Sequence, residues 1–483
     1  MAVRKLPTTI KLFWGIGQIG EGVKNSAFNS FLLFYYNQIL GVSATLTAIA
    51  LAVAVLFDAI SDPLVGSISD RFQSRWGRRH PFMAASAAPM AITLFLLFSP
   101  PSGMSEMFYF GWVMFFAISV RTFLTLYHIP HLALGAEMAT DYEDRSALFS
   151  FGLFFGAIAG FGFWFCMLTF VFPPQPDLPN GMYEAAGYPR MAASAGSIAF
   201  IAIILCVWGT RKEIPNLSQA IPAKTPLSLV RLFNELKVAF SSPSYRSIFF
   251  GLMLGTVVLS VEAAFTPFMG VHFWGLETNL LRWLGVGVLV GLVPGTIAGA
   301  YLVRILDKKW CLIIPAVIAI TNANVLIILR LFELLPDNGH WVILPMLIAS
   351  SCLGGFVGPV IYITINSMFA DIADELELTT GERQEGIVYS ARAFAGKAAA
   401  ALGTVVGGLA LDVIAFPKKA VPGTVDPDVI FNLGLFQGPI TSVFTLGGLA
   451  LYLGYKLSRS RHQEIVSELT RRKEESLSLP VSP

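Results

Sequence analysis

Twelve apolar segments, each about the length needed to cross a lipid bilayer, constrain this chain more than any other feature of its sequence. A membrane-spanning helix needs roughly 20 predominantly apolar residues. Backbone polar groups inside a bilayer must be satisfied within the segment itself, which favours helices. The predicted spans are 12–40, 43–68, 81–99, 107–135, 146–172, 190–209, 247–273, 281–304, 311–334, 341–369, 387–416 and 432–456. We therefore predict an all-α integral membrane protein with twelve transmembrane helices.

The amino-acid composition supports this class and argues against several others. Of the 483 residues, 55% are hydrophobic and 13% are charged, whereas soluble proteins carry roughly 25% charged residues. The net charge of +2 gives no reason to expect a nucleic-acid partner. No pair of cysteines has CxxC spacing, so we expect neither disulfides nor a zinc site from Cys166, Cys206, Cys311 and Cys352.

Motifs for catalysis are missing from the sequence. It contains no HExxH zinc motif, no GxSxG nucleophile elbow and no GxxxxGK[ST] phosphate loop. We therefore expect no enzyme activity, no ATP-driven pumping and no cofactor.

The distribution of positive charge predicts the orientation. Most of the 33 lysines and arginines fall in loops on the side that also holds both termini, and such loops face the cytoplasm. The longest interior hydrophilic stretch, 210–246, contains an amphipathic helical pattern of Leu229, Leu232, Phe233, Leu236 and Phe240. We therefore predict an integral protein of the plasma (inner) membrane with both termini in the cytoplasm. It consists of an N-terminal half at 1–209, this cytoplasmic linker at 210–246, a C-terminal half at 247–456 and a cytoplasmic tail at 457–483.

The two halves repeat the same loop chemistry. Acidic and basic residues follow both the fourth and the tenth span: Glu137, Asp144 and Arg145 after one, and Asp374, Glu375, Glu382 and Arg383 after the other. An internal duplication of this kind is typical of transporters in which two halves rock around a central site. We expect two pseudo-symmetric six-helix halves. We also expect a monomer that is surrounded by membrane lipids and transports a small-molecule solute.

Ionisable side chains within the spans are candidates for function, because each costs roughly 2.5–3.5 kcal/mol at bilayer depth. Asp58 and Asp62 lie one helical turn apart on the second span, with Ser61 beside them. Their oxygens suit Na⁺, a hard cation, and equally suit a proton shared between like charges. The alternative is that the charged groups neutralise one another as structural ion pairs among Asp58, Asp62, Arg121 and Lys397.

The first span carries a polar stripe at helical spacing, which consists of Gln18, Gly22, Asn25 and Asn29. Such a stripe lines a water-filled cavity or, alternatively, strengthens contacts between helices; we favour the cavity. On the same span, Glu21 and Lys24 can satisfy each other's charge. Further ionisable groups within the spans include Arg121, His128, Glu262, Arg392 and Lys397.

Four motifs are spread in order over most of the chain. They are Phe57-Asp58-Ala-Ile-Ser-Asp62-Pro63-Leu-Val-Gly66, Ser74-Arg75-Trp76-Gly77-Arg78-Arg79-His80-Pro81-Phe82, Tyr127-His128-Ile129-Pro130, and Ala370-Asp371-Ile-Ala-Asp374 followed later by Lys397. Together they resemble the glycoside–pentoside–hexuronide:cation symporter family, a branch of the major facilitator superfamily. This resemblance implies the fold of the superfamily. It also implies a cation site made of Asp58, Ser61, Asp62 and Thr125, in which Asp58 and Asp62 are the candidate ligands of Na⁺. We assign coupling roles to Lys397 and Arg121.

The resemblance does not extend to galactoside recognition. None of the positions that contact the sugar in galactoside-carrying members keeps the family's residue: they correspond to Glu21, Gly22, His128, Leu132, Leu153 and Tyr362. Two residues, His128 and Glu262, resemble instead the sodium-dependent lysophosphatidylcholine symporters of the same family. We therefore expect a rebuilt substrate cavity that includes Gln18, Glu21, Asn25, His128, Glu262 and Tyr362.

Charged residues at the predicted cytoplasmic face indicate a gate. The gate residues are Asp70, Arg71, Arg75, Arg78, Arg79, Glu137, Asp144, Arg145, Asp371, Asp374 and Arg383. We expect the arginines after the second span to pair with Glu137 and Asp144 when the cavity faces outward.

These observations predict a secondary active transporter that couples Na⁺ or H⁺ to the symport of an organic solute by alternating access. A sugar or glycoside is the default substrate of the resembled family, and an amphipathic lysolipid or an organic anion is the alternative. A downhill uniporter or a non-transporting receptor would share the fold, although a receptor would have little need of paired carboxylates.

Overall fold

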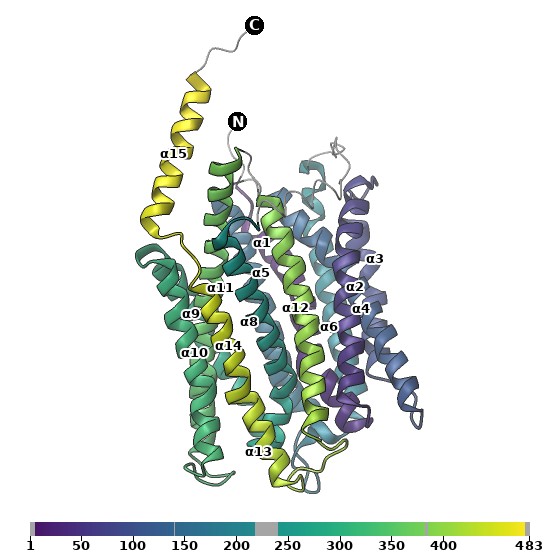
Figure 1. The fold of residues 1–483 in the computed structure, drawn as a ribbon. Coiled ribbons are helices and arrows are strands. Elements are labelled where there is room, and N and C mark those ends of the chain that lie inside the picture. The colour runs from purple at the N-terminus through teal and green to yellow at the C-terminus, as the bar shows by residue number, and fades with distance from the viewer. Residues whose placement is uncertain (1–4, 140, 218–239, 382–384, 479–483) are drawn as a thin grey trace.

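The structure, a computed structural model, is a bundle of long helices that run side by side (Figure 1). It describes residues 5–139, 141–217, 240–381 and 385–478. Apart from an isolated bridge between Gln175 and Leu178, the regular structure of these residues is helical, which confirms the predicted all-α class.

The two ends of the bundle can be told apart by the chain segments that lie at each. Helix α1 (Thr8–Ala27) begins at the end where α14 (Thr441–Tyr452) finishes and where α15 (Arg459–Ser478) lies (Figure 1). This end is named the tail end below, and the opposite end is named the far end.

The first half of the chain forms six long helical rods. α1 continues through two π-helical segments, Phe28–Leu32 and Tyr35–Ile39, as one rod that crosses the bundle. The other rods are α2 (Ala44–Arg71), α3 (His80–Leu97), α4 (Glu106–Met138), α5 (Tyr142–Cys166) with its π extension Met167–Val171, and α6 (Gly187–Thr210). Short 3-10 segments at Gly181–Tyr183 and Arg211–Asn216 flank α6.

The second half repeats this arrangement and adds a tail helix. Its rods are α8 (Pro243–Phe268) with its π extension Met269–Phe273, α9 (Thr278–Ile305), α10 (Lys308–Leu331), α11 (Ile343–Thr380), α12 (Glu385–Val413), and α13 (Pro427–Leu435) joined to α14 by the π segment Phe436–Ile440. The amphipathic helix expected in the linker lies outside the described residues, apart from Phe240.

Eleven of the described helices are long and apolar enough to cross a membrane. The one predicted span outside these eleven is the first, which corresponds to the α1 rod; it has comparable length but is more polar because it carries Gln18, Asn25 and Asn29. α11 is longer than predicted, since it ends at Thr380 rather than near residue 369. As a result, Asp371 and Asp374 lie within its last turns and not in a loop.

Serine caps fix the depth at which two central helices start. The Ser43 side chain accepts a hydrogen bond from a backbone N–H in the first turn of α2, and Ser105 does the same for α4. A helix rises about 1.5 Å per residue, so Asp58 and Arg121 both lie about 22–24 Å along their helices from these caps. The two charges therefore reach the same depth in the bundle.

Helix packing brings the two halves together along two seams. Within the halves, α1 packs against α5 and α6, α4 against α2 and α3, α11 against α9 and α10, and α8 against α12 and α14. Between the halves, α2 packs against α12, and α5 packs against α9. At the far end, aromatic rings from both halves join in the core, where the Phe34 and Phe268 ring centroids are 5.5 Å apart.

Candidate functional site

Polar side chains of α4 bond to carboxylates of α2, and in both pairs the α4 residue lies 63 positions after its α2 partner in the sequence. The Arg121 guanidinium forms an ion pair with Asp58 Oδ2. One turn further on, Thr125 Oγ1 donates a hydrogen bond to Asp62 Oδ1 at 2.9 Å. The two carboxylates of α2 therefore face a guanidinium and a hydroxyl on α4.

Asp58 is the more enclosed of the two carboxylates. Its side chain is 10% exposed, against 26% for Asp62. Asp58 Oδ1 is buried and accepts no hydrogen bond from the described residues. The Ser61 hydroxyl donates at 3.5 Å to the backbone oxygen of Asp58, so it is engaged by its own helix. Asp58 is thus held through one oxygen, and its second oxygen has a free acceptor site.

Lys397 reaches this cluster from the other half of the protein. It lies on α12, and its Nζ forms an ion pair with Asp62 Oδ2. Both oxygens of Asp62 are therefore engaged, one by Thr125 and one by Lys397. The structural ion pairs expected as the alternative, Asp58 with Arg121 and Asp62 with Lys397, are present, and the cation site of Asp58, Ser61, Asp62 and Thr125 stays a prediction.

α1 places a further positive charge beside the cluster. Lys24 is 4% exposed and donates to Asn25 Oδ1 at 2.7 Å. The Phe28 ring lies 5.3 Å from Lys24 Nζ and 5.9 Å from the guanidinium carbon of Arg121. The sequence suggested Glu21 as the partner of Lys24. In the structure Glu21 instead lies beside His128 of α4.

A cavity of about 890 Å³ lies next to this cluster, among α1, α4, α5, α8, α9 and α11. This volume is within the roughly 300–1,000 Å³ typical of small-molecule sites. One wall is polar and comes from α1 and the π segment that continues it: Gln18, Glu21, Asn25, Ser26, Asn29 and Ser30. α5 and α9 supply an apolar wall: Leu153, Ala157, Phe161, Trp164, Leu281, Leu284 and Val288.

Most of the expected substrate residues lie on the wall of this cavity: Gln18, Glu21, Asn25, His128 and Tyr362. Glu262 is not among the described lining residues, and its α8 neighbours Ala263 and Thr266 are. His128 Nδ1 lies 3.2 Å from Glu21 Oε2, a distance that makes an ion pair when the imidazole is protonated. The described lining contains no lysine or arginine.

Gly22 shows physically why a galactoside site of the resembled type does not fit here. α1 approaches α5 so closely that a Cβ on Gly22 would lie 2.3 Å from the Gly156 carbonyl oxygen. Any side chain at this position would therefore force α1 and α5 apart. Leu132 and Leu153, at the positions of two further sugar contacts, line the cavity with hydrocarbon.

Comparison with known proteins agrees with this geometry. The profile of the family described as MFS/sugar transport protein, from the major facilitator superfamily, matches residues 13–459. The chain belongs to this family. The resemblance deduced from the four sequence motifs is confirmed, and the protein is an integral membrane transporter.

Three curated relatives of this MFS transporter are similar along most of their length. The inner membrane symporter YicJ of Escherichia coli is 24% identical, over 81% of this chain and 80% of its own. The glucuronide carrier protein homolog of Escherichia coli is 23% identical, over 94% of both chains. The isoprimeverose transporter of Lactiplantibacillus pentosus is 23% identical, over 84% of this chain and 80% of its own.

Solved structures establish the fold of this MFS transporter. A D-xylose–proton symporter aligns with a TM-score of 0.62 and 15% identity, over 92% of this chain and 97% of its own. A bacterial homologue of the human lysosomal transporter Spinster, solved facing inward, aligns with a TM-score of 0.64 and 14% identity, over 93% and 96% of the two chains.

The first-half gate residues of the transporter pair with one another at the tail end. Glu137 Oε1 lies 2.7 Å from Arg78 and 2.8 Å from Arg79, and Arg79 also pairs with Asp70 at 2.5 Å. Asp144 pairs with Lys11 at 2.6 Å instead of with an arginine. In this structure these pairs join α2, α3 and α4, and α1 with α5, within one half. Arg71 and Arg75 are exposed, and Arg145 donates to the Ala136 carbonyl oxygen.

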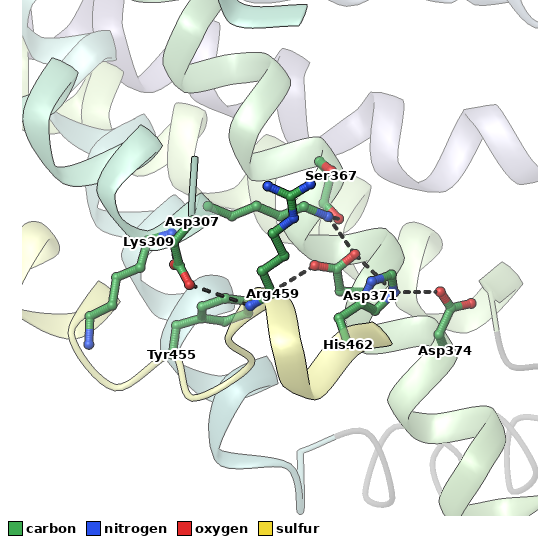
Figure 2. Close-up of polar contacts among 9 residues, drawn as sticks. Asp307, Lys309, Ser367, Asp371, Asp374, Tyr455, Arg459 and His462 are labelled. Carbon is green, nitrogen blue, oxygen red and sulfur yellow. Dashed lines mark hydrogen bonds and ion pairs between the residues drawn. The ribbon is translucent and has the colours of Figure 1, made fainter. Parts of the chain in front are cut away.

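The second-half gate carboxylates contact the tail helix (Figure 2). Asp371 pairs with Lys308 at 2.5 Å and accepts from Tyr455 Oη at 3.1 Å. His462 of α15 places Nε2 3.0 Å from Asp374 Oδ2 and 3.3 Å from Asp371 Oδ1. The remaining expected gate residue, Arg383, lies outside the described residues. The expected pairing of arginines with Glu137 is present in this structure and that with Asp144 is not, and the role of these residues as a gate stays a prediction.

At the far end, hydrogen bonds of the transporter join the two halves directly. Gln38 is 1% exposed; its amide donates to the Pro417 oxygen at 3.1 Å and accepts from the Ala420 N–H at 2.9 Å. Tyr183 Oη lies 2.8 Å from His272 Nε2. Gln38 was not predicted from the sequence, where its one signal was an amide near the end of the first span.

Proposed function

We propose that this MFS transporter is a symporter in which a cation, Na⁺ or H⁺, competes with Lys397 for Asp62 and drives the movement of a neutral glycoside-type solute. The observation that carries the proposal is the position of Asp62. It is bonded to Thr125 in its own half and to Lys397 in the other half. A cation that takes the place of Lys397 therefore breaks a contact between the halves.

This exchange gives the cation a differential effect on the two states of an alternating-access cycle. A ligand shifts a conformational equilibrium only if it binds one state better than the other. With Lys397 on Asp62, α2 and α12 are linked; with a cation on Asp62, Thr125 and the free oxygen of Asp58, that link is gone. Two carboxylates and a hydroxyl are oxygen ligands of the kind that hard cations prefer.

The cavity favours a neutral polar solute over the alternatives. An organic anion or a lysolipid phosphate needs a cationic partner, and the described lining contains no lysine or arginine. The polar wall of the α1 rod supplies hydrogen-bonding groups, and Phe161 and Trp164 supply aromatic faces for the apolar faces of a sugar ring. The relative named for isoprimeverose supports the same substrate class, and the relative named for glucuronide supports a glycoside, although its own solute carries a carboxylate.

We place the tail end in the cytoplasm, because lysines and arginines concentrate there. The bonds of Gln38 and Tyr183 close the far end, so the solute's route leads to the tail end. The structure then corresponds to an inward-facing state of a monomeric transporter with two rocking halves.

Uptake into proteoliposomes tests the proposal. The probes are radiolabelled methyl glucoside, methyl galactoside and methyl xyloside, each offered with an inward Na⁺ gradient, with an inward H⁺ gradient and with neither. We expect one gradient to drive accumulation of at least one probe, and Asp62→Asn to abolish it. Asp177→Asn, in an exposed loop at the far end, is the matched control and should transport normally. Gradient-driven accumulation that survives in Asp62→Asn refutes the cation site, and equal equilibration under all conditions identifies a uniporter.

A further inference from the structure

His131, one turn beyond His128 on α4, is buried directly behind the cavity wall. Its residue is 0% exposed. Its ring stacks on Trp14, with centroids 4.4 Å apart, and on Tyr127, with centroids 5.0 Å apart. Trp14 and Gln18, the residues in front of it, line the cavity. His131 therefore touches the solute site only through other residues.

The partners of its two ring nitrogens fix the tautomer of His131. Nε2 lies 2.9 Å from the backbone oxygen of Trp14, and a carbonyl oxygen accepts but never donates, so Nε2 carries the proton. The ring is enclosed by aromatic neighbours, where an unpaired charge is costly, so we take it as neutral. Nδ1 is then an acceptor, and it lies 3.4 Å from the side-chain nitrogen of Gln18. The Gln18 amide nitrogen therefore donates to His131.

Close packing leaves the Gln18 amide little room to turn. The residue is 9% exposed, and α5 approaches it at a glycine. A Cβ on Gly152 would lie 2.8 Å from the Trp14 ring and 3.2 Å from Gln18 Cγ. With its nitrogen held by His131, the amide has its carbonyl oxygen Oε1 left for the cavity, and no donor among the described residues reaches that oxygen.

We propose that His131 is a positioning residue that orients the Gln18 amide, so that Oε1 presents a fixed hydrogen-bond acceptor and selects solutes that donate a hydroxyl proton to the α1 wall. The inference rests on the proposed glycoside function and names a determinant of its specificity. A preorganised acceptor binds a donor without the cost of ordering a mobile side chain. It also discriminates against a solute group that can only accept a hydrogen bond, because Oε1 and that acceptor atom then face each other without a proton between them.

Fluorinated sugars test this polarity, because fluorine replaces a hydroxyl in size but donates no proton. Equilibrium binding to the purified protein is measured for the methyl glycoside probes and for the deoxyfluoro derivatives of whichever probe binds, one hydroxyl at a time. We expect one position at which fluorine weakens binding about tenfold. In Gln18→Met, which keeps the length of the side chain, and in His131→Phe, which keeps a stacked ring, that ratio should fall to near one. His131→Asn retains an acceptor near the position of Nδ1 and should keep most of the ratio.

The outcomes separate this inference from the function on which it rests. If no methyl glycoside binds the wild-type protein, the glycoside function is wrong and this inference falls with it. If a glycoside binds but His131→Phe weakens all derivatives equally, His131 is merely structural and the inference is overturned. Thermal unfolding checks that each variant folds. Should His131→Phe not fold, a ratio in His131→Asn as low as that in Gln18→Met overturns the inference as well.

Discussion

Lys397 on α12 and Asp62 on α2 form an ion pair that joins the two halves of the transporter at the depth of its intramembrane charges. Asp58, one turn earlier on α2, pairs instead with Arg121 inside its own half. The two carboxylates therefore make different contributions: Asp58 fastens α2 to α4, and Asp62 meets the opposite half.

Asp58→Asn should destabilise the folded protein more than Asp62→Asn. The first change leaves the Arg121 guanidinium, 20% exposed, without its carboxylate, whereas Lys397 is 30% exposed and closer to water. Removal of one partner from a buried pair costs about 3 kcal/mol or more. The melting temperatures of the two variants in detergent measure the difference. The double variant Asp58→Asn with Arg121→Gln should recover part of the loss, and equal melting temperatures of the two single variants would contradict the assigned roles.

Gln38→Ala should shift the transporter toward its outward-facing state. The change removes two hydrogen bonds between the halves, each worth about 1 kcal/mol, so the population ratio should move by about tenfold or more. A cysteine at Ser30 on the cavity wall, in a background without the native cysteines, should then react faster with an impermeant thiol reagent added from the far side. Gln175→Ala, an exposed far-end control, should not change the labelling rate. Identical rates in all three proteins would show that Gln38 does not seal the far end.

His128→Gln should weaken solute binding and reduce its enhancement by the cation. His128 lies on the cavity wall beside Glu21, and Thr125, one turn earlier, bonds to Asp62. A single helix thus connects the solute side and the cation side, which permits a coupling free energy between them. Solute affinity with and without saturating cation gives this coupling directly. An unchanged ratio of the two affinities excludes His128 as the coupling residue.

The contact of α15 with α11 should loosen as the pH rises. A hydrogen bond to the Asp374 carboxylate, helped by the charge of Asp371, raises the pKa of His462 above its usual value, which is about 6.5. Lys308 also faces this histidine and acts in the opposite direction. Because the pKa is raised in the docked state, the stabilisation is fully present below about pH 6.5 and is lost as the pH rises through the raised pKa.

Amide hydrogen exchange of residues 459–478, corrected for the intrinsic pH dependence, measures this docking. Exchange in the wild-type protein should accelerate between pH 6 and pH 8 beyond the intrinsic change, whereas His462→Gln should show the intrinsic change alone. Ile465, 1% exposed against the second-half core, anchors the helix independently of pH, so the effect should be partial. The same corrected pH response in both proteins would remove His462 from the explanation.

Much of this protein was determined by its sequence taken one segment at a time. The bilayer requires each span to satisfy its own backbone and to be apolar for roughly 20 residues, so spans are legible without knowledge of their neighbours. The same rule makes Asp58 and Asp62 conspicuous, because a charge at that depth must have a reason. The stripe of Gln18, Asn25 and Asn29 was readable too, since its spacing is a property of one helix.

Tertiary structure alone decided which residues meet. Glu21 takes His128 as its partner, and Asp62 takes Lys397 from a helix more than three hundred positions away. Gln18 contacts His131, a residue that no sequence pattern singled out. Pairing of this kind depends on the relative depth and rotation of neighbouring helices, which caps and close glycine contacts set by fractions of a turn. Hydropathy and residue spacing describe each helix along its own axis. They do not determine how far one helix is shifted or rotated relative to its neighbour.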